Sequence, residues 1–158
     1  MRTLLARLNY LLGWSLFFSV ARFSESLHTF AMGRMRRAAD RGDMRARRFY
    51  GTLLLYKGIG PSSVKAGFDY LQQSAAAGDV EAQFHLAEIY AQGKLLEVPQ
   101  NHALAVQYYQ QAAAAGHTMA ALRLAKAYQS GALGLPADAA LADTWMKKFL
   151  DKGQSLHE

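Results

Sequence analysis

Residues 78–116 read GDVEAQFHLAEIYAQGKLLEVPQNHALAVQYYQQAAAAG, and they decide the fold. One alanine run ends at Gly116, another ends at Gly78, and weaker copies end at Gly42 and Gly153. These four glycines are 36, 38 and 37 residues apart along the chain. A period of this length is typical of a protein that stacks copies of one small structural unit.

Each copy predicts two helices. Ser63, Asn101 and Asp138 stand at matching positions, and each has a side-chain oxygen that can accept a hydrogen bond from a first-turn N–H. We expect a helix to begin at each of them and to end at the repeated glycine, which suits a left-handed turn. The expected ranges are 43–57, 79–92 and 117–130 for the first helix of each copy, and 63–77, 101–115 and 138–152 for the second.

Hydrophobic spacing supports the helices. Ala82, Leu86, Ile89 and Tyr90 fall at i, i+4, i+7 and i+8, which places them on one face of a helix. The same spacing recurs one copy later, and no run of alternating residues predicts a strand. The sequence therefore predicts an all-α protein.

The repeated positions resemble the Sel-one-like repeat (SLR) family, a branch of the tetratricopeptide-like helical repeats. The middle copy carries the pattern best, at Gly78, Ala82, Leu86, Ala87, Tyr90, Gly93, Asn101, Ala105, Tyr108, Ala112, Ala113 and Gly116. The resemblance implies a right-handed superhelical α/α solenoid of about three repeats over residues 42–153. An apolar N-terminal helix and an Arg-rich degenerate half-repeat would fill residues 1–41, and residues 154–158 would form a tail.

The resemblance also implies a non-enzymatic scaffold for protein–protein interaction, or an assembly or accessory subunit. In such a solenoid the inner surface holds a partner protein. We expect the contacts at four polar positions of the first helices of the copies, Gln83, Glu88, Arg123 and Lys126. The alternative is that these side chains belong to ordinary solvated helix faces.

Little in the sequence points to catalysis, a cofactor or a metal. The chain has no cysteine, which removes thiol nucleophiles, disulfides and thiolate metal sites. His85 and Glu88 are spaced as two metal ligands on one helix could be, but a transition-metal site needs three or four ligands. We expect no enzyme and no cofactor. An alternative class is an exported periplasmic repeat protein with a hydrolase or stress-related role, which would need a catalytic cluster in one cleft.

Positive charge is confined to the first third of the chain. The net charge is +6, yet residues 1–50 carry ten arginines against three acidic residues, and the remainder is close to neutral. The basic patch comprises Arg34, Arg36, Arg37, Arg41 and Arg45. Few aromatic residues stand among these arginines, and motifs that read nucleic-acid bases are absent. Nucleic acid is therefore disfavoured as a partner. Contact with anionic lipid fits the apolar neighbouring segment better.

That neighbouring segment, residues 8–21, has no charge and predicts a helix that is apolar nearly all round. One interpretation is a secretory signal cleaved near Ala21, and a mitochondrial presequence is a further one. A second is a helix at the cytoplasmic side of a bacterial inner membrane, docking through Tyr10, Trp14, Phe17 and Phe18 onto lipid or a membrane protein. A third is a degenerate leading repeat, because Gly13 and Gly51 are one repeat apart.

Overall fold

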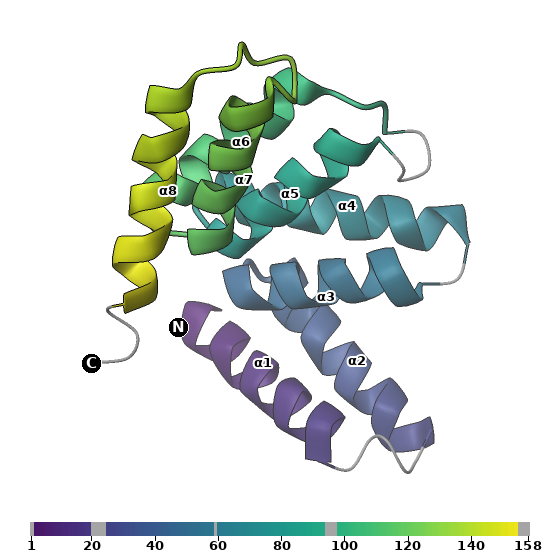
Figure 1. Ribbon diagram of the computed structural model, residues 1–158. Coiled ribbons are helices and arrows are strands. Elements are labelled where there is room, and N and C mark those ends of the chain that lie inside the picture. The colour runs from purple at the N-terminus through teal and green to yellow at the C-terminus, as the bar shows by residue number, and fades with distance from the viewer. Residues whose placement is uncertain (1, 20–24, 59, 94–97, 155–158) are drawn as a thin grey trace. The chain divides into compact units, whose positions relative to one another are not determined.

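The computed structural model describes residues 2–19, 25–58, 60–93 and 98–154. Within these ranges the chain forms eight helices and no strand (Figure 1), which confirms the all-α prediction. The helices are α1 Arg2–Ser19, α2 Glu25–Asp40, α3 Met44–Lys57, α4 Pro61–Ala76, α5 Val80–Gln92, α6 His102–Ala114, α7 Thr118–Ser130 and α8 Ala139–Gln154.

Two compact units share these helices. The first unit is Met1–Asp79 and contains α1 to α4, and the second is Val80–Glu158 and contains α5 to α8. Inside each unit every helix packs on the next one along the chain, as helix hairpins do (Figure 1). The division falls inside the predicted 42–153 repeat array, between its first and second copies.

Three of the four repeated glycines end their helices as predicted. Gly42, Gly78 and Gly116 have φ angles of 92°, 89° and 93°, a left-handed conformation that glycine adopts without steric cost. The fourth prediction is wrong, because α8 continues to Gln154 and includes Gly153 in its last turn.

Two of the three predicted N-caps are confirmed. Asn101 accepts a hydrogen bond from the backbone N–H of Leu104 at 3.0 Å, and Asp138 accepts one from Leu141 at 2.9 Å. Ser63 is not a cap, since α4 begins two residues earlier at Pro61. Proline suits that first position because its ring presets the helical φ and its missing N–H would have had no partner there.

Small residues bring the helix backbones close together. In the first unit a Cβ added to Gly51 of α3 would lie 2.8 Å from the carbonyl oxygen of Gly67 in α4. A Cβ on Gly67 would lie 2.6 Å from the carbonyl oxygen of Gly51. In the second unit alanines take the place of these glycines in the packed core. Ala105, Ala112 and Ala120 are fully buried there. Helix packing in both units therefore depends on close approach of the backbones.

Candidate functional site

Two of the four predicted partner-contact residues bind each other. Glu88 of α5 accepts hydrogen bonds from the Tyr109 hydroxyl of α6 and from Nε of Arg123 in α7, both at 2.7 Å. A second Arg123 nitrogen, Nη2, lies 3.4 Å from the other Glu88 oxygen. One carboxylate thus joins three helices of the second unit. We call Glu88, Tyr109 and Arg123 the carboxylate tie.

The electrostatics of the carboxylate tie favour its ionised form. Burial by itself would raise the pKa of Glu88, but hydrogen bonds from Arg123 and Tyr109 outweigh it and hold the pKa below its usual value. Burial, reinforced by the bond to Glu88, raises the pKa of Tyr109, so its hydroxyl stays a donor. Of the three, Arg123 is the most exposed to solvent, with 42% of its side chain exposed against 21% for Glu88.

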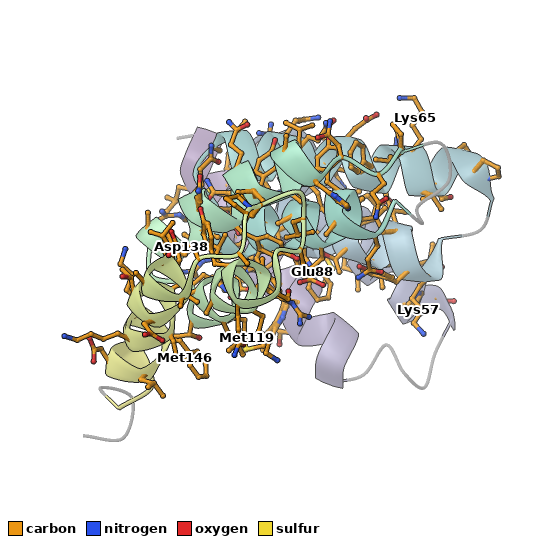
Figure 2. The ribbon with its side chains drawn as sticks, turned by 45° about the horizontal axis from the view of Figure 1, so that its top comes forward. Lys57, Lys65, Glu88, Met119, Asp138 and Met146 are labelled. Carbon is orange, nitrogen blue, oxygen red and sulfur yellow. The ribbon has the colours of Figure 1, made fainter. Side chains whose placement is uncertain are left out.

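The other two predicted residues stand apart from the tie. Gln83 is half-buried on α5, five residues before Glu88 and so about 140° away around the helix. Lys126 is exposed on α7, one turn after Arg123. Met119, 41% exposed, lies one turn before Arg123 on the same helix (Figure 2). Met119, Arg123 and Lys126 are exposed along one side of α7, and we call them the exposed α7 ridge.

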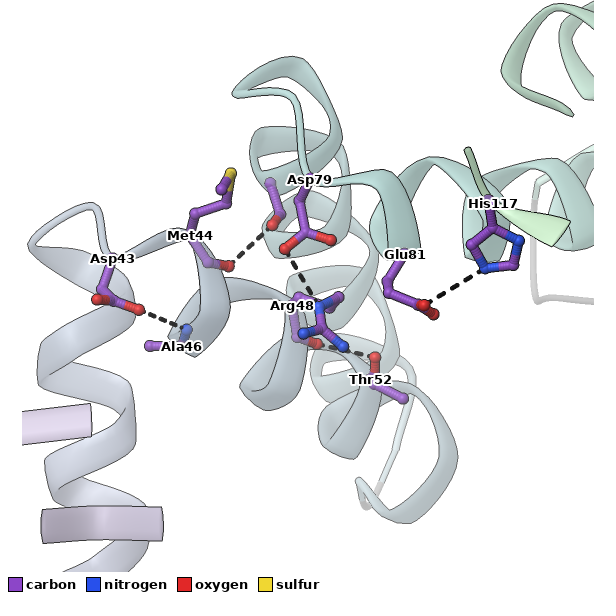
Figure 3. Close-up of polar contacts among 9 residues, drawn as sticks. Asp43, Met44, Ala46, Arg48, Thr52, Asp79, Glu81 and His117 are labelled. Carbon is purple, nitrogen blue, oxygen red and sulfur yellow. Dashed lines mark hydrogen bonds and ion pairs between the residues drawn. The ribbon is translucent and has the colours of Figure 1, made fainter. Parts of the chain in front are cut away.

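A second polar link between α5 and α7, which the sequence did not predict, involves His117. Its Nδ1 accepts from the backbone N–H of Ala120 at 3.2 Å, and its Nε2 lies 3.4 Å from Glu81 (Figure 3). The ring also stacks on Phe84 at 4.3 Å between centroids. Glu81 and His117 are 36 residues apart, close to one repeat period, and that spacing is the signal that could have revealed the link.

The first unit has comparable links. Arg48 of α3 donates through Nε to Asp79 at 3.1 Å, and the Ser74 hydroxyl of α4 donates to the carbonyl of Met44 at 2.9 Å (Figure 3). Asp43 caps α3 by accepting from the Ala46 N–H at 2.8 Å. These bonds fasten α4 and the residues after it to the start of α3.

Three arginines of the predicted basic patch are engaged inside the first unit. Arg34 donates to the side chain of Asn9 in α1. Arg36 lies 3.8 Å from Asp40, one turn later on α2. Arg37 donates through Nε to the carbonyl of its own helix at Gly33, at 3.1 Å. The remaining two, Arg41 and Arg45, lie on the wall of a cleft between α1 and the start of α3.

The α1 helix, whose residues 8–21 were expected to be apolar nearly all round, has two faces that differ in burial. Ala6, Asn9 and Gly13 are buried, and a Cβ on Gly13 would lie 2.9 Å from Met35 of α2. The opposite face exposes the leucine stripe, which consists of Leu4, Leu5, Leu8, Leu11 and Leu12. Small residues face the helix partner because they permit close approach, and the leucines are left outside.

The predicted docking residues of this segment differ in their placement. Trp14 is largely exposed beside the leucine stripe. Tyr10 is half-buried and packs against the alanine cluster of α2 and α3. The side chains of Phe17 and Phe18, and the cleavage position near Ala21, lie outside what the structure describes. Among the described residues, no helix has both the length and the hydropathy needed to span a bilayer.

No group of three or more metal-ligating side chains occurs within the described ranges. Glu88, which could have joined His85 at a metal, instead serves as the acceptor of the carboxylate tie. The described residues also include two exposed regions: the exposed α7 ridge in the second unit, and the leucine stripe with its neighbouring arginine cleft in the first.

Comparison with known proteins agrees with this picture. A protective antigen of uropathogenic Escherichia coli strains with an SLR fold is 20% identical, with a TM-score of 0.81 over 96% of this chain and 32% of that one. A Sel1 repeat protein from Oxalobacter formigenes is 24% identical, with a TM-score of 0.77 over 92% of this chain and 58% of that one. The chain thus spans less than two thirds of either structure.

The repeats themselves are recognised in the sequence. The model of the Sel1 repeat family matches residues 45–79, 80–117 and 118–154. No curated protein sequence matches the chain significantly. Sel1 repeat proteins are generally scaffolds for protein–protein interaction, and their fold is typically non-catalytic. Since the three matches cover most of its length and the helices follow their boundaries, this chain belongs to the Sel1 repeat family.

Proposed function

We propose that this protein is a non-enzymatic interaction scaffold, an accessory subunit held at the cytoplasmic face of a bacterial inner membrane by α1. The observation that carries the proposal is the exposed leucine stripe. Leu4 and Leu11 have 63% and 58% of their surface exposed, although they belong to the most apolar segment of the chain. A contiguous exposed apolar face of this kind marks a site of contact with lipid or protein.

The geometry of α1 suits a helix that lies in the membrane surface. The five leucines occupy positions i, i+1, i+4, i+7 and i+8, an arc of about 120° around the helix. Arg7 and Trp14 flank that arc on one side. An arginine can extend its charge to the lipid headgroups, and a tryptophan prefers the same depth. The opposite face stays occupied by α2.

The scaffold function belongs to the repeats. The carboxylate tie and the His117 link hold α5 and α7 together through hydrogen bonds and ring stacking. This support presents the exposed α7 ridge on a pre-organised surface, which lowers the entropic cost of binding a partner. We place the protein contact at Met119, Arg123 and Lys126, with Glu88 acting as the support for Arg123. Gln83 lies on another face of α5 and would contact a partner separately.

Vesicle flotation of the full chain tests the membrane part. We expect the wild type to float with vesicles, and Leu4→Ser/Leu11→Ser to reduce the bound fraction at least tenfold, because two large apolar side chains are lost from the contact. The matched control is Leu141→Ser/Leu150→Ser, which removes two exposed leucines from α8. Circular dichroism checks that helix content is retained. A wild type that stays with the soluble fraction, or equal losses in both variants, contradicts the proposal.

The intact mass of the protein isolated from its native cells tests localisation. Retention of residues 1–21 is expected, since α1 is the proposed attachment and packs closely on α2. A mass that corresponds to cleavage near Ala21 would instead indicate export to the periplasm, and the membrane-attached scaffold would then be wrong.

A further inference from the structure

A cleft in the first unit lies between α1 and the turn that joins α2 to α3. Its volume is about 480 Å³. The charged part of its lining is Arg7 from α1, Arg41 from the turn, and Asp43 and Arg45 from the start of α3. Leu11 of the leucine stripe lines it as well. The cleft therefore joins a cationic wall to the exposed apolar face of α1.

The three arginines of the cleft differ from their neighbours in their side-chain bonding. Within the described part of the chain, the side chains of Arg7, Arg41 and Arg45 are exposed and make no hydrogen bond or ion pair. Five other arginines nearby are all engaged, namely Arg34, Arg36, Arg37, Arg47 and Arg48. Among the arginines whose side chains the structure describes, those without such a bond are thus concentrated at one place.

The charge of the cleft favours an anion. Three guanidinium groups face one carboxylate, and that carboxylate, Asp43, already accepts the Ala46 N–H at 2.8 Å. The N-terminus of α3 adds further positive partial charge at the same place. One guanidinium group can donate two parallel hydrogen bonds to two oxygens of a phosphate, and this arrangement is both strong and geometrically specific. A phosphate monoester or diester matches this set of donors.

We propose that the cleft between α1 and the α2–α3 turn is a headgroup site for an anionic phospholipid. A lipid phosphate held by Arg7, Arg41 and Arg45 can continue as an acyl chain past Leu11 along the leucine stripe. A free phosphate could use the arginines but would gain nothing from the leucines. This inference rests on the proposed attachment of the protein to a membrane. It adds that the protein recognises lipids with a negatively charged headgroup, in addition to making apolar contact with the bilayer.

The test compares flotation of the full chain on phosphatidylcholine vesicles with and without phosphatidylglycerol, at constant ionic strength. Arg41→Gln/Arg45→Gln is expected to lower the phosphatidylglycerol-dependent binding by about thirtyfold, on the order of fivefold for each basic residue near an anionic surface. The matched control, Arg36→Gln/Arg37→Gln, removes the same charge from the same unit but leaves the cleft intact. It is expected to retain most of that binding.

The outcomes separate the headgroup site from the proposed function. Equal losses in the two double variants would show diffuse attraction to the basic patch and overturn the site. Binding that is the same on both vesicle types would also overturn it, while membrane attachment would stand. Failure to bind either vesicle would remove the proposed function itself. Soluble glycerophosphate is expected to compete poorly; full competition at matched ionic strength would overturn the assignment to lipid.

Discussion

The two units of this protein use their charged residues differently. In the second unit the carboxylate tie joins α5, α6 and α7, and Glu81 meets His117. In the first unit the cleft arginines make no side-chain hydrogen bond or ion pair with any described residue, beside a helix that exposes its leucines. Charged side chains that bond to one another hold their helices in place. Charged side chains without such a bond, beside an apolar surface, can instead bind a ligand. The comparison assigns support of the scaffold to the second unit and attachment to the first.

The largest expected effect comes from the glycine contact that holds the first unit together. Gly67→Ala places a methyl group 2.6 Å from the Gly51 carbonyl oxygen and 2.8 Å from the Leu55 nitrogen. Because both atoms belong to the backbone of α3, the helices must separate. We expect the free energy of unfolding to fall by about 2–3 kcal/mol in urea titrations.

Gly33→Ala on α2 is the control for the glycine contact. Its nearest neighbour is the end of the flexible Arg37 side chain at 3.8 Å. Alanine has the higher helix propensity, so the variant is expected to be as stable as the wild type or up to about 1 kcal/mol more stable. Equal destabilisation by both substitutions would refute the close-contact explanation.

Substitution of Glu88 tests how much the carboxylate tie contributes to the stability of the second unit. Glu88→Gln keeps the shape of the side chain but removes the charge that Arg123 and Tyr109 share, and should cost about 1–3 kcal/mol of unfolding free energy. Glu81→Gln removes the same charge from the same helix, where the carboxylate is 52% exposed and lies 3.4 Å from His117. Because Glu81 is open to solvent, its contact with His117 contributes little, and a loss of less than about 1 kcal/mol is expected. Reversal of this order would show that the tie does not stabilise the unit.

Acid should weaken the second unit through the same carboxylate. The pKa of Glu88 is lowered from 4.5 in the folded chain, so the unfolded chain takes up its proton first as the pH falls. The stabilisation is therefore complete above pH 4.5 and is lost below it. Unfolding titrations on both sides of this pH should show a smaller acid-induced loss in Glu88→Gln than in the wild type. An unchanged loss would mean that other carboxyl groups account for the acid sensitivity.

The smallest effect is expected at high pH in the first unit. Burial, followed by a hydrogen bond to Asp40, raises the pKa of Tyr70 from 10.0 to about 12. The unfolded chain then loses this proton first, so the stabilisation is present below pH 10.0 and is lost as the pH rises toward about 12. Tyr70→Phe should flatten this part of the stability profile. Spectrophotometric titration of the tyrosines checks the assignment.

The general architecture could be predicted because it depends on local and periodic features. Asn101 and Asp138 cap their helices, and Gly78 and Gly116 turn the chain, through contacts within a few residues. The error at Ser63 has the same local character, since Pro61 competes for the same helix start. The pairing of Glu88 with Arg123 was not predicted. It joins residues 35 apart, and the two side chains meet only when α5 and α7 are in contact.

The sequence by itself determined the repeat period, the all-α class and the segregation of positive charge into the first third of the chain. Spacing along one chain carries this information without any contact between distant residues. The tertiary structure decided which face of α1 is covered, which polar residues of α5 and α7 bond to one another, and which arginines among the described residues form ion pairs or hydrogen bonds. Those outcomes depend on how neighbouring helices are rotated against each other, and small residues such as Gly13, Gly51 and Gly67 set that rotation by allowing backbones to meet.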